Sequence, residues 1–144
     1  MLRQFSVLAF AAMVGGIVGL YAAGALFASQ PISIAVQVAA FLLMIAARLT
    51  FGRRSFHAAA NPTAGGLVTN GPYAYVRHPI YAAVIYFAWA GALSHLSALS
   101  AAAAAVVTAG AFARMLIEEQ LLTEKYPAYT QYRQRVRRIL PFVF

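Results

Sequence analysis

The stretch FSVLAFAAMVGGIVGLYAAGALFA, residues 5–28, contains no charged residue. A helix of about 20 apolar residues is long enough to cross the hydrocarbon core of a bilayer. The rest of the chain has the same character, because 62% of its 144 residues are hydrophobic, only 10% are charged and the mean hydropathy is +0.73. This composition is not that of a soluble domain, and it predicts a small helical membrane protein.

Three further apolar stretches follow the first, so we expect one all-α domain, residues 1–144, that forms an integral membrane helical bundle. It has four predicted transmembrane helices, at about residues 5–28, 31–51, 79–96 and 98–117. The last two are short or weakly hydrophobic, and the alanine-rich fourth one is expected to depend on packing between small residues. A loop at 52–78 and a tail at 118–144 complete the chain.

The positions of the basic residues predict the orientation of these spans. All eleven Lys and Arg residues lie at the N-terminus, between Arg48 and Arg77, or from Arg114 onward. By the positive-inside rule, both termini and the loop at 52–78 are expected to be cytoplasmic. The net charge of +8 then faces anionic membrane lipid and does not indicate a nucleic-acid partner.

A cleaved signal peptide is the alternative interpretation of residues 1–30, because Arg3 precedes an apolar core with an alanine-rich end. That core is longer than the roughly 7–15 residues of most signal peptides, so a retained span is favoured. The later spans keep the same orientation in either case. The chain has no cysteine, which excludes thiolate metal sites and cysteine nucleophiles, and we expect no metal site.

Polar residues gather in two places. The segment GPYAYVRHPIY, residues 71–81, lies just before the third span, and Pro79 suits the first turn of a helix. Such a helix start offers backbone N–H groups to an anion. All three carboxylates of the chain, those of Glu118, Glu119 and Glu124, follow the fourth span.

A helix that continues past residue 117 predicts a particular pairing of these charges. Arg114 and Glu118 are then separated by one turn and can form an ion pair, while Glu119 points away from Arg114 and stays available. Together with Arg77 and His78, the acids would give a pocket with opposite charges at its two ends. Such a pocket suits a zwitterion, although each charge has an ordinary explanation as a solvated residue at the membrane surface.

The tail is expected to form an interfacial helix on the cytoplasmic side. In AYTQYRQRVRRILPF the residues at helical spacing are Tyr129, Tyr132, Val136 and Ile139, with arginines on other faces. This helix would lie on anionic lipid and frame a lateral opening, or would serve as a simple anchor.

The chain resembles the isoprenylcysteine carboxyl methyltransferase and phospholipid methyltransferase family. The resemblance is carried by LVTNGPYAYVRHPIY, residues 67–81, followed after one helical hairpin by RMLIEEQLLTEKYPAYTQYRQRVRRILPF, residues 114–142. An R-H-P-x-Y, an E-E-x-x-L, a Y-x-x-Y and an L-P-F occur in the expected order. The family often has Gly two residues after the motif tyrosine, whereas this chain has Ala83 there.

The resemblance implies an integral membrane enzyme that transfers a methyl group from S-adenosylmethionine without a Rossmann-type domain. It places the cofactor on the cytoplasmic side, between the two motifs. The implied cofactor-binding residues are Arg77, His78, Pro79, Tyr81, Glu118 and Glu119. We assign catalytic roles to Arg114 and Glu118, with Arg114 orienting an anionic acceptor.

The acceptor is the least determined part of the prediction. A lipophilic acceptor of the prenylcysteine carboxylate type is favoured, and phospholipid amines or small thiols are the alternatives that the resemblance leaves open. A non-catalytic membrane scaffold and a small transporter subunit are the non-enzymatic alternatives. The apolar cores of the spans hold no Asp, Glu, Lys or Arg, which counts against the transporter.

Overall fold

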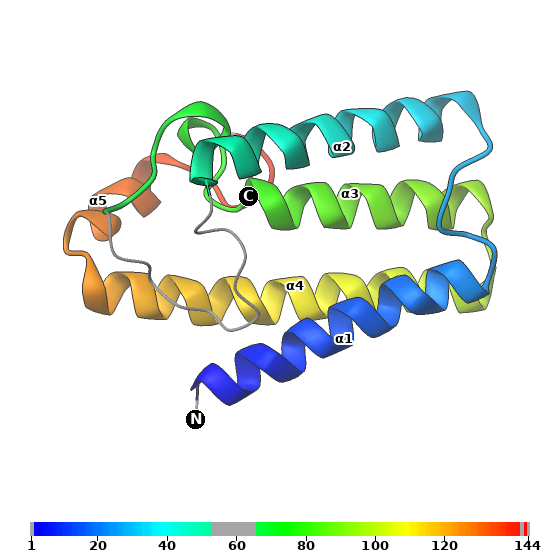
Figure 1. The fold of residues 1–144 in the computed structure, drawn as a ribbon, viewed down its shortest axis with the longest axis horizontal. Coiled ribbons are helices and arrows are strands. Elements are labelled where there is room, and N and C mark those ends of the chain that lie inside the picture. Colours follow the sequence, from blue (N-terminus) through cyan, green and yellow to red (C-terminus); the bar gives the residue numbers. More distant parts are fainter. Residues whose placement is uncertain (1, 53–65, 142, 144) are drawn as a thin grey trace.

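The computed structural model describes residues 2–52, 66–141 and 143, and its regular elements are all helices (Figure 1). This confirms the predicted all-α fold. The elements are α1 (Leu2–Ala22), α2 (Pro31–Phe51), the 3-10 helix η2 (Gly71–Ala74), α3 (Pro79–Ser94), α4 (Ala98–Lys125) and α5 (Ala128–Arg135). Most of the first half of the predicted loop at 52–78, and Phe142 of the L-P-F motif, lie outside the described residues.

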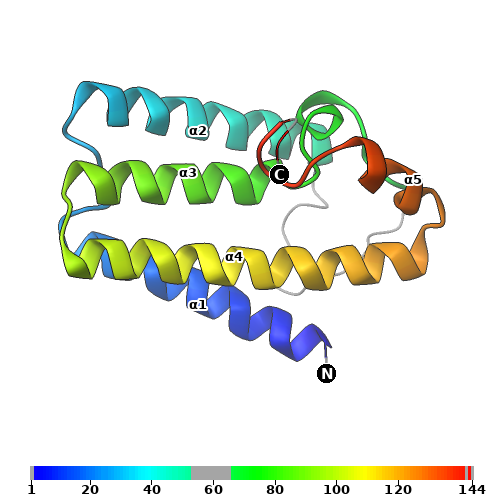
Figure 2. The ribbon, with the colours of Figure 1, turned by 180° about the vertical axis from the view of Figure 1, so that it is seen from behind.

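The four long helices pack in the order α2, α3, α4 and α1. Helix α3 packs between α2 and α4, and α1 runs along the other side of α4 (Figures 1 and 2). The contact surfaces are built mainly from small side chains, with Ala103, Ala104, Val107 and Ala111 of α4 buried in the core. The start of α1 and the segment that follows α5 lie toward the same end of the bundle (Figure 1).

Three of the described helices, α1, α2 and α4, are long and apolar enough to cross a membrane. Helix α3 is apolar but has 16 residues, which makes it about 24 Å long against roughly 30 Å of hydrocarbon. The lengths therefore support a membrane protein with three spans, and the fourth span at α3 stays a prediction. The orientation of the termini also stays a prediction.

The first predicted span, residues 5–28, is wrong at its C-terminal end, because α1 stops at Ala22. Gly24 has a positive φ of 65°, and its N–H donates to the Tyr21 carbonyl at 3.0 Å. The Ala25 N–H donates to the Leu20 carbonyl at 2.8 Å. These two bonds form a Schellman motif, which ends a helix even inside an apolar run.

The side chain of Gln37, in the second span, stabilises the loop that follows α1 through hydrogen bonds. Gln37 of α2 is buried, and its amide nitrogen donates to the carbonyls of Leu26 at 2.8 Å and Phe87 at 3.1 Å. Its amide oxygen accepts from the Ala28 N–H at 2.9 Å. Gln37 therefore provides hydrogen bonds that lipid cannot give to a loop near the membrane.

Helix α4 is longer than the predicted span at 98–117 and continues to Lys125. It begins with a capping box in which the Ser97 and Ser100 side chains each bind the other's backbone N–H. It ends just before Pro127, which cannot continue a helix with the same hydrogen bonds. Glu118 and Glu119 therefore lie on a regular helix, as the predicted pairing with Arg114 requires.

The tail differs from the predicted interfacial helix, since α5 ends at Arg135. Val136 and Ile139 therefore do not lie on one helix with Tyr129 and Tyr132. Instead, residues 136–139 run beside residues 76–78, with a parallel bridge between Val76 and Arg137.

The pairing of the tail has a local cause in the motif before α3. A residue that precedes proline is pushed out of the helical region, and His78 accordingly has a non-helical backbone, with φ −126° and ψ 58°. The Arg77 N–H donates to the Arg137 carbonyl at 2.7 Å, and the His78 N–H donates to the Arg138 carbonyl at 3.0 Å. The tail after α5 therefore does not continue as a helix, despite the helical spacing of its residues. It forms backbone hydrogen bonds with residues 76–78, which are far away in the sequence.

Candidate functional site

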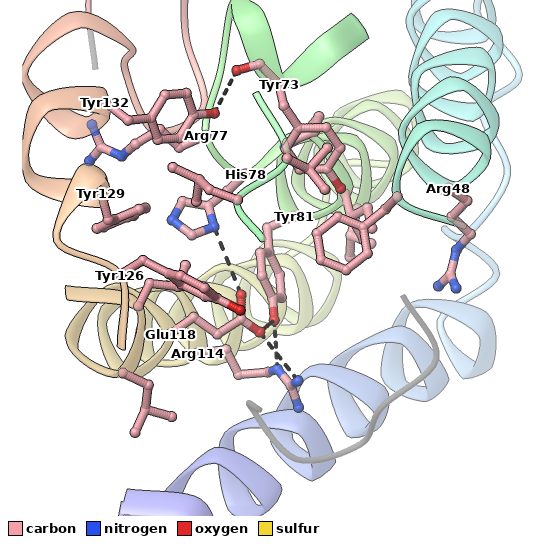
Figure 3. Close-up of a pocket in the computed structure, with 18 of the residues that line it drawn as sticks. Arg48, Tyr73, Arg77, His78, Tyr81, Arg114, Glu118, Tyr126, Tyr129 and Tyr132 are labelled. Atoms are coloured by element: carbon pink, nitrogen blue, oxygen red, sulfur yellow. Dashed lines mark hydrogen bonds and ion pairs between the residues drawn. The ribbon is translucent and has the colours of Figure 1, made fainter. Parts of the chain in front are cut away.

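A cavity of about 220 Å³ lies at the end of the bundle where α4 continues toward α5 (Figure 3). This is far above the roughly 10–15 Å³ that one water molecule needs, so the cavity has room for an organic ligand. Helix α1 contributes Phe10 and Met13 to its wall, and α2 contributes Met44, Arg48 and Phe51. The segment from Gly66 to Val84, the end of α4 and three tyrosines of the tail complete it.

The cavity brings the two predicted motifs together. Six of the seven predicted site residues line it, namely Arg77, His78, Pro79, Tyr81, Arg114 and Glu118. Glu119 is not part of the lining and lies behind the wall that Arg77 and His78 form. The long separation of the motifs in the sequence is bridged because α3 and α4 pack side by side.

Tyr81, Arg114 and Glu118 form one connected polar group in the cavity wall (Figure 3). Arg114 is 4% exposed, and its Nε donates to the Tyr81 hydroxyl at 2.8 Å. That hydroxyl in turn donates to Oε1 of Glu118. Arg114 Nη2 lies 3.5 Å from the same carboxylate oxygen, so the predicted pairing of Arg114 with Glu118 is confirmed.

Tyr81→Phe is expected to lower the stability of the protein, although the Arg114–Glu118 ion pair remains in the variant. The variant removes one donor to Glu118 and one acceptor for Arg114, and each unsatisfied buried group costs about 1–3 kcal/mol. Thermal unfolding in detergent measures the loss. Tyr75→Phe is the matched control, because the Tyr75 side chain is exposed outside the cavity, and an equal loss in both variants would contradict a special role for the Tyr81 hydroxyl.

Glu119 is the centre of a second, larger group of charges. The residue is 7% exposed, and Oε1 accepts from Arg77 Nη2 at 2.7 Å and lies 3.1 Å from His78 Nε2. Arg138 Nη2 donates to Oε2 at 3.1 Å, and Arg138 Nε lies within 3.3 Å of both oxygens. Three segments, the motif before α3, helix α4 and the C-terminal segment, therefore meet on one carboxylate.

These contacts correct two expectations about the site. Glu119 is not left available by the Arg114–Glu118 pair, because Arg77, His78 and Arg138 occupy both of its oxygens. The start of α3 also does not present the Arg77 and His78 amides to an anion, because the tail carbonyls accept both. Arg77 Nη1 donates further to the Arg133 and Val136 carbonyls. Cofactor binding by Arg77 or Glu119 remains a prediction.

An aromatic wall faces the cavity from η2 and the tail. It consists of Tyr73 of η2 and of Tyr126, Tyr129 and Tyr132 of the tail. The Tyr132 hydroxyl donates to the Tyr73 carbonyl, whereas the buried Tyr129 hydroxyl makes no hydrogen bond within the part of the chain that the structure describes. Burial, followed by the negative charge of Glu119, raises the pKa of Tyr129 to about 12. Tyr129 therefore stays protonated and can act as a donor.

Tyr126 and Arg48 line this cavity although neither was predicted to be a site residue. Tyr126 received no role, and Arg48 was used only among the basic residues that predict the orientation of the spans. A signal for Arg48 was present, since Met44, Arg48 and Phe51 recur at the i, i+4 and i+7 spacing of one helix face. What could not be seen from the sequence is that this face turns toward the R-H-P-x-Y motif.

The cavity carries an excess of positive charge. Among the described lining residues, Arg48, Arg77 and Arg114 stand against the single carboxylate of Glu118. The group behind the wall adds Arg138 and Glu119, which offset each other. The remaining acid of the chain, Glu124, is exposed and accepts a hydrogen bond from Gln120.

The sequence of the chain matches the model of a known protein family. The model of the phospholipid methyltransferase family matches residues 32–129, which is more than half of the chain. The match begins in α2 and ends in α5, so it includes Arg48, the R-H-P-x-Y motif and both glutamates of the site. No curated protein and no solved structure matches the chain.

Proposed function

The chain belongs to the phospholipid methyltransferase family, and we propose that it transfers a methyl group from S-adenosylmethionine to a lipophilic acceptor at the cytoplasmic face of a membrane. Three apolar helices of spanning length support the membrane location. We propose further that the acceptor is a carboxylate attached to an apolar chain, of the prenylcysteine type. The excess of positive charge in the cavity favours this acceptor over a cationic one.

The observation that carries the proposal is the joining of polar and apolar walls in one cavity. Glu118, Arg114 and His78 give the cavity charged and hydrogen-bonding groups, and Phe10 and Met13 give it apolar ones. The two kinds of wall meet where the Phe10 ring centroid lies 5.1 Å from the Arg114 guanidinium carbon. Such a cavity can hold a water-soluble donor beside a membrane-embedded acceptor. Methyl transfer between two such molecules needs this juxtaposition.

The residues of the cavity fit S-adenosylmethionine. The cofactor has a carboxylate that requires donors, an ammonium and ribose hydroxyls that require acceptors, and an adenine ring that stacks on aromatic side chains. The buried Tyr129 hydroxyl is a donor that makes no hydrogen bond within the described residues, and Glu118 offers a carboxylate at the cavity surface. His78 and the aromatic wall of tyrosines complete the set.

The chain's own residues then have limited tasks in the reaction. When bound, S-adenosylmethionine would supply a methyl group on a cationic sulfur and would leave as S-adenosylhomocysteine once the S–CH3 bond is exchanged for an O–CH3 bond. A carboxylate acceptor is already ionised and would have no proton to lose. No general base is required, so the residues bind, orient and exclude water. Arg114 is held by Tyr81 and Glu118, which suits it to orient an anionic acceptor.

Glu118→Gln is expected to weaken the binding of S-adenosylmethionine by about tenfold or more, since a hydrogen bond to a charged group contributes roughly 1.5–3 kcal/mol. Calorimetry on the protein in detergent measures this affinity. Glu124→Gln removes an exposed acid from the same helix and is expected to leave the affinity unchanged. Equal affinities for the wild-type protein and Glu118→Gln would remove Glu118 from the cofactor site.

A phospholipid amine is the second candidate acceptor, favoured by the description of the matching family and by the carboxylate of Glu118 as a partner for an ammonium group. Incubating membranes that contain the protein with methyl-labelled cofactor separates the candidates. A base-labile ester supports the carboxylate, a labelled lipid headgroup supports the amine, and a volatile product indicates a small thiol. Cofactor binding without any labelled product would favour a non-catalytic scaffold.

A further inference from the structure

We propose that Arg48 selects the acceptor by binding its carboxylate, while the apolar chain of the acceptor leaves the cavity between α1 and α2. This inference rests on the proposed function and adds to it a specificity residue and a path into the membrane. The four residues that line the path, Phe10 and Met13 of α1 with Met44 and Phe51 of α2, are called the passage residues below.

The position of Arg48 suits this role. It lies in the last turn of α2, on the same helix face as Met44 and Phe51, and its Nε donates to the Met44 sulfur at 3.4 Å. Figure 3 shows Arg48 and the tyrosines Tyr126 and Tyr129 on opposite sides of the cavity, with Tyr81 and Arg114 between them. A cofactor against the tyrosines and an acceptor against Arg48 would therefore meet near Arg114.

The packing of the helices leaves the path between α1 and α2. Helix α1 packs on α4 and α2 packs on α3, whereas the described parts of α1 and α2 make almost no contact with each other. The passage residues are all apolar, and those of α1 and those of α2 line the same cavity. Because α1 and α2 are both apolar enough to span a bilayer, the chain of a lipid molecule can continue from the passage into hydrocarbon.

Charge complementarity decides what the polar end of this molecule is. The described lining has three arginines and one carboxylate, and S-adenosylmethionine brings a further net positive charge. An anionic acceptor reduces the repulsion between these charges, and a cationic amine increases it. Methylation also converts the carboxylate into a neutral ester, which removes the attraction to Arg48 and favours release of the product.

The test compares the binding of S-farnesyl-N-acetylcysteine with that of its methyl ester, on the protein in nanodiscs saturated with S-adenosylhomocysteine. The wild-type protein is expected to bind the acid at least about tenfold more tightly than the ester. Arg48→Gln is expected to abolish this preference by weakening the acid alone, and Arg48→Lys to restore part of it. Arg135→Gln, which removes an exposed arginine outside the cavity, is the matched control.

The path is tested separately with a farnesyl analogue that carries a photoactivatable diazirine. Crosslinks are expected in the peptides that contain the passage residues. Crosslinks confined to peptides of α3 and α4 would overturn the path.

The remaining outcomes separate this inference from the proposed function. Equal binding of acid and ester by the wild-type protein would overturn the role of Arg48 and leave methyl transfer intact. A loss of S-adenosylhomocysteine affinity in Arg48→Gln, with the preference for the acid retained, would move Arg48 to the cofactor site and overturn the inference. Binding of S-adenosylhomocysteine with no binding of acid or ester would reject the lipophilic acceptor, and the inference with it. No binding of S-adenosylhomocysteine would reject the proposed function itself.

Discussion

Glu119→Ala is expected to lower the free energy of unfolding by about 3–5 kcal/mol, because removing one partner of a buried ion pair leaves uncompensated charge. In this protein the loss affects Arg77, His78 and Arg138 together. The repulsion between Arg77 and Arg138 should release the C-terminal segment from the backbone of residues 76–78. Unfolding in mixed detergent micelles, followed by circular dichroism, measures the change in stability.

The matched control for this prediction lies on the same helix. Glu124→Ala removes an exposed acid that accepts a hydrogen bond from the Gln120 amide, and it is expected to change stability by less than about 0.5 kcal/mol. If Glu119→Ala unfolds like the wild-type protein but fails to bind S-adenosylmethionine, Glu119 is a ligand of the cofactor, as the sequence indicated. The stabilising role inferred from its contacts would then be contradicted.

Arg138 distinguishes the two roles of Glu119 more sharply. Arg138 donates to both carboxylate oxygens of Glu119 but does not line the cavity. If Glu119 stabilises the tail, Arg138→Gln should destabilise the protein in the same direction, and the double variant should lose less than the sum of the single losses. Independent, additive losses would show that the two residues act separately.

The comparison of the two motifs shows how much of the site could be predicted. Arg114 and Glu118 were expected to pair because a helix places residues four apart on one face, and this local rule does not depend on the rest of the fold. The partners of Glu119 could not be derived in the same way. Arg138 lies 19 residues away along the chain and reaches Glu119 only because the tail turns back after α5.

The all-α class of the fold was predicted correctly, whereas the ends of several predicted helices were wrong for physical reasons. Apolar composition predicts helices in lipid, but it does not mark where an apolar helix ends. At Gly24 a left-handed backbone ends α1 within an uninterrupted apolar run. In the tail, two tyrosines and the apolar Val136 and Ile139 had helical spacing, but the chain pairs with the backbone around Val76 after Arg135.

The sequence also did not predict that Arg48 lines the cavity. The sequence places Arg48 at a helix end, where arginine is common near a membrane surface. Only the packing of α2 against α3 turns the face with Met44 and Arg48 toward the cavity. Residue identity and spacing give a helix face, and the neighbouring helices determine what that face contacts.

The second large effect is expected where α1 crosses α4. A Cβ atom on Gly16 would lie 2.8 Å from the Ala103 carbonyl oxygen, 2.9 Å from the Val107 amide nitrogen and 2.7 Å from the Val107 side chain. Two of these atoms belong to the α4 backbone and cannot move without moving the helix. Gly16→Val is therefore expected to force α1 away from α4 and to cost about 3 kcal/mol or more, at the upper end of overpacking effects.

Gly15→Val provides the control, because a Cβ atom on Gly15 meets nothing within 4 Å. The two variants add the same side chain at adjacent positions of one helix, so differences in expression or hydrophobicity cancel. Gly16→Val should also weaken acceptor binding, since Phe10 and Met13 of the cavity wall lie on the displaced helix. Unfolding in mixed micelles measures stability, and equal stabilities for the two variants would show that α1 and α4 do not pack through Gly16.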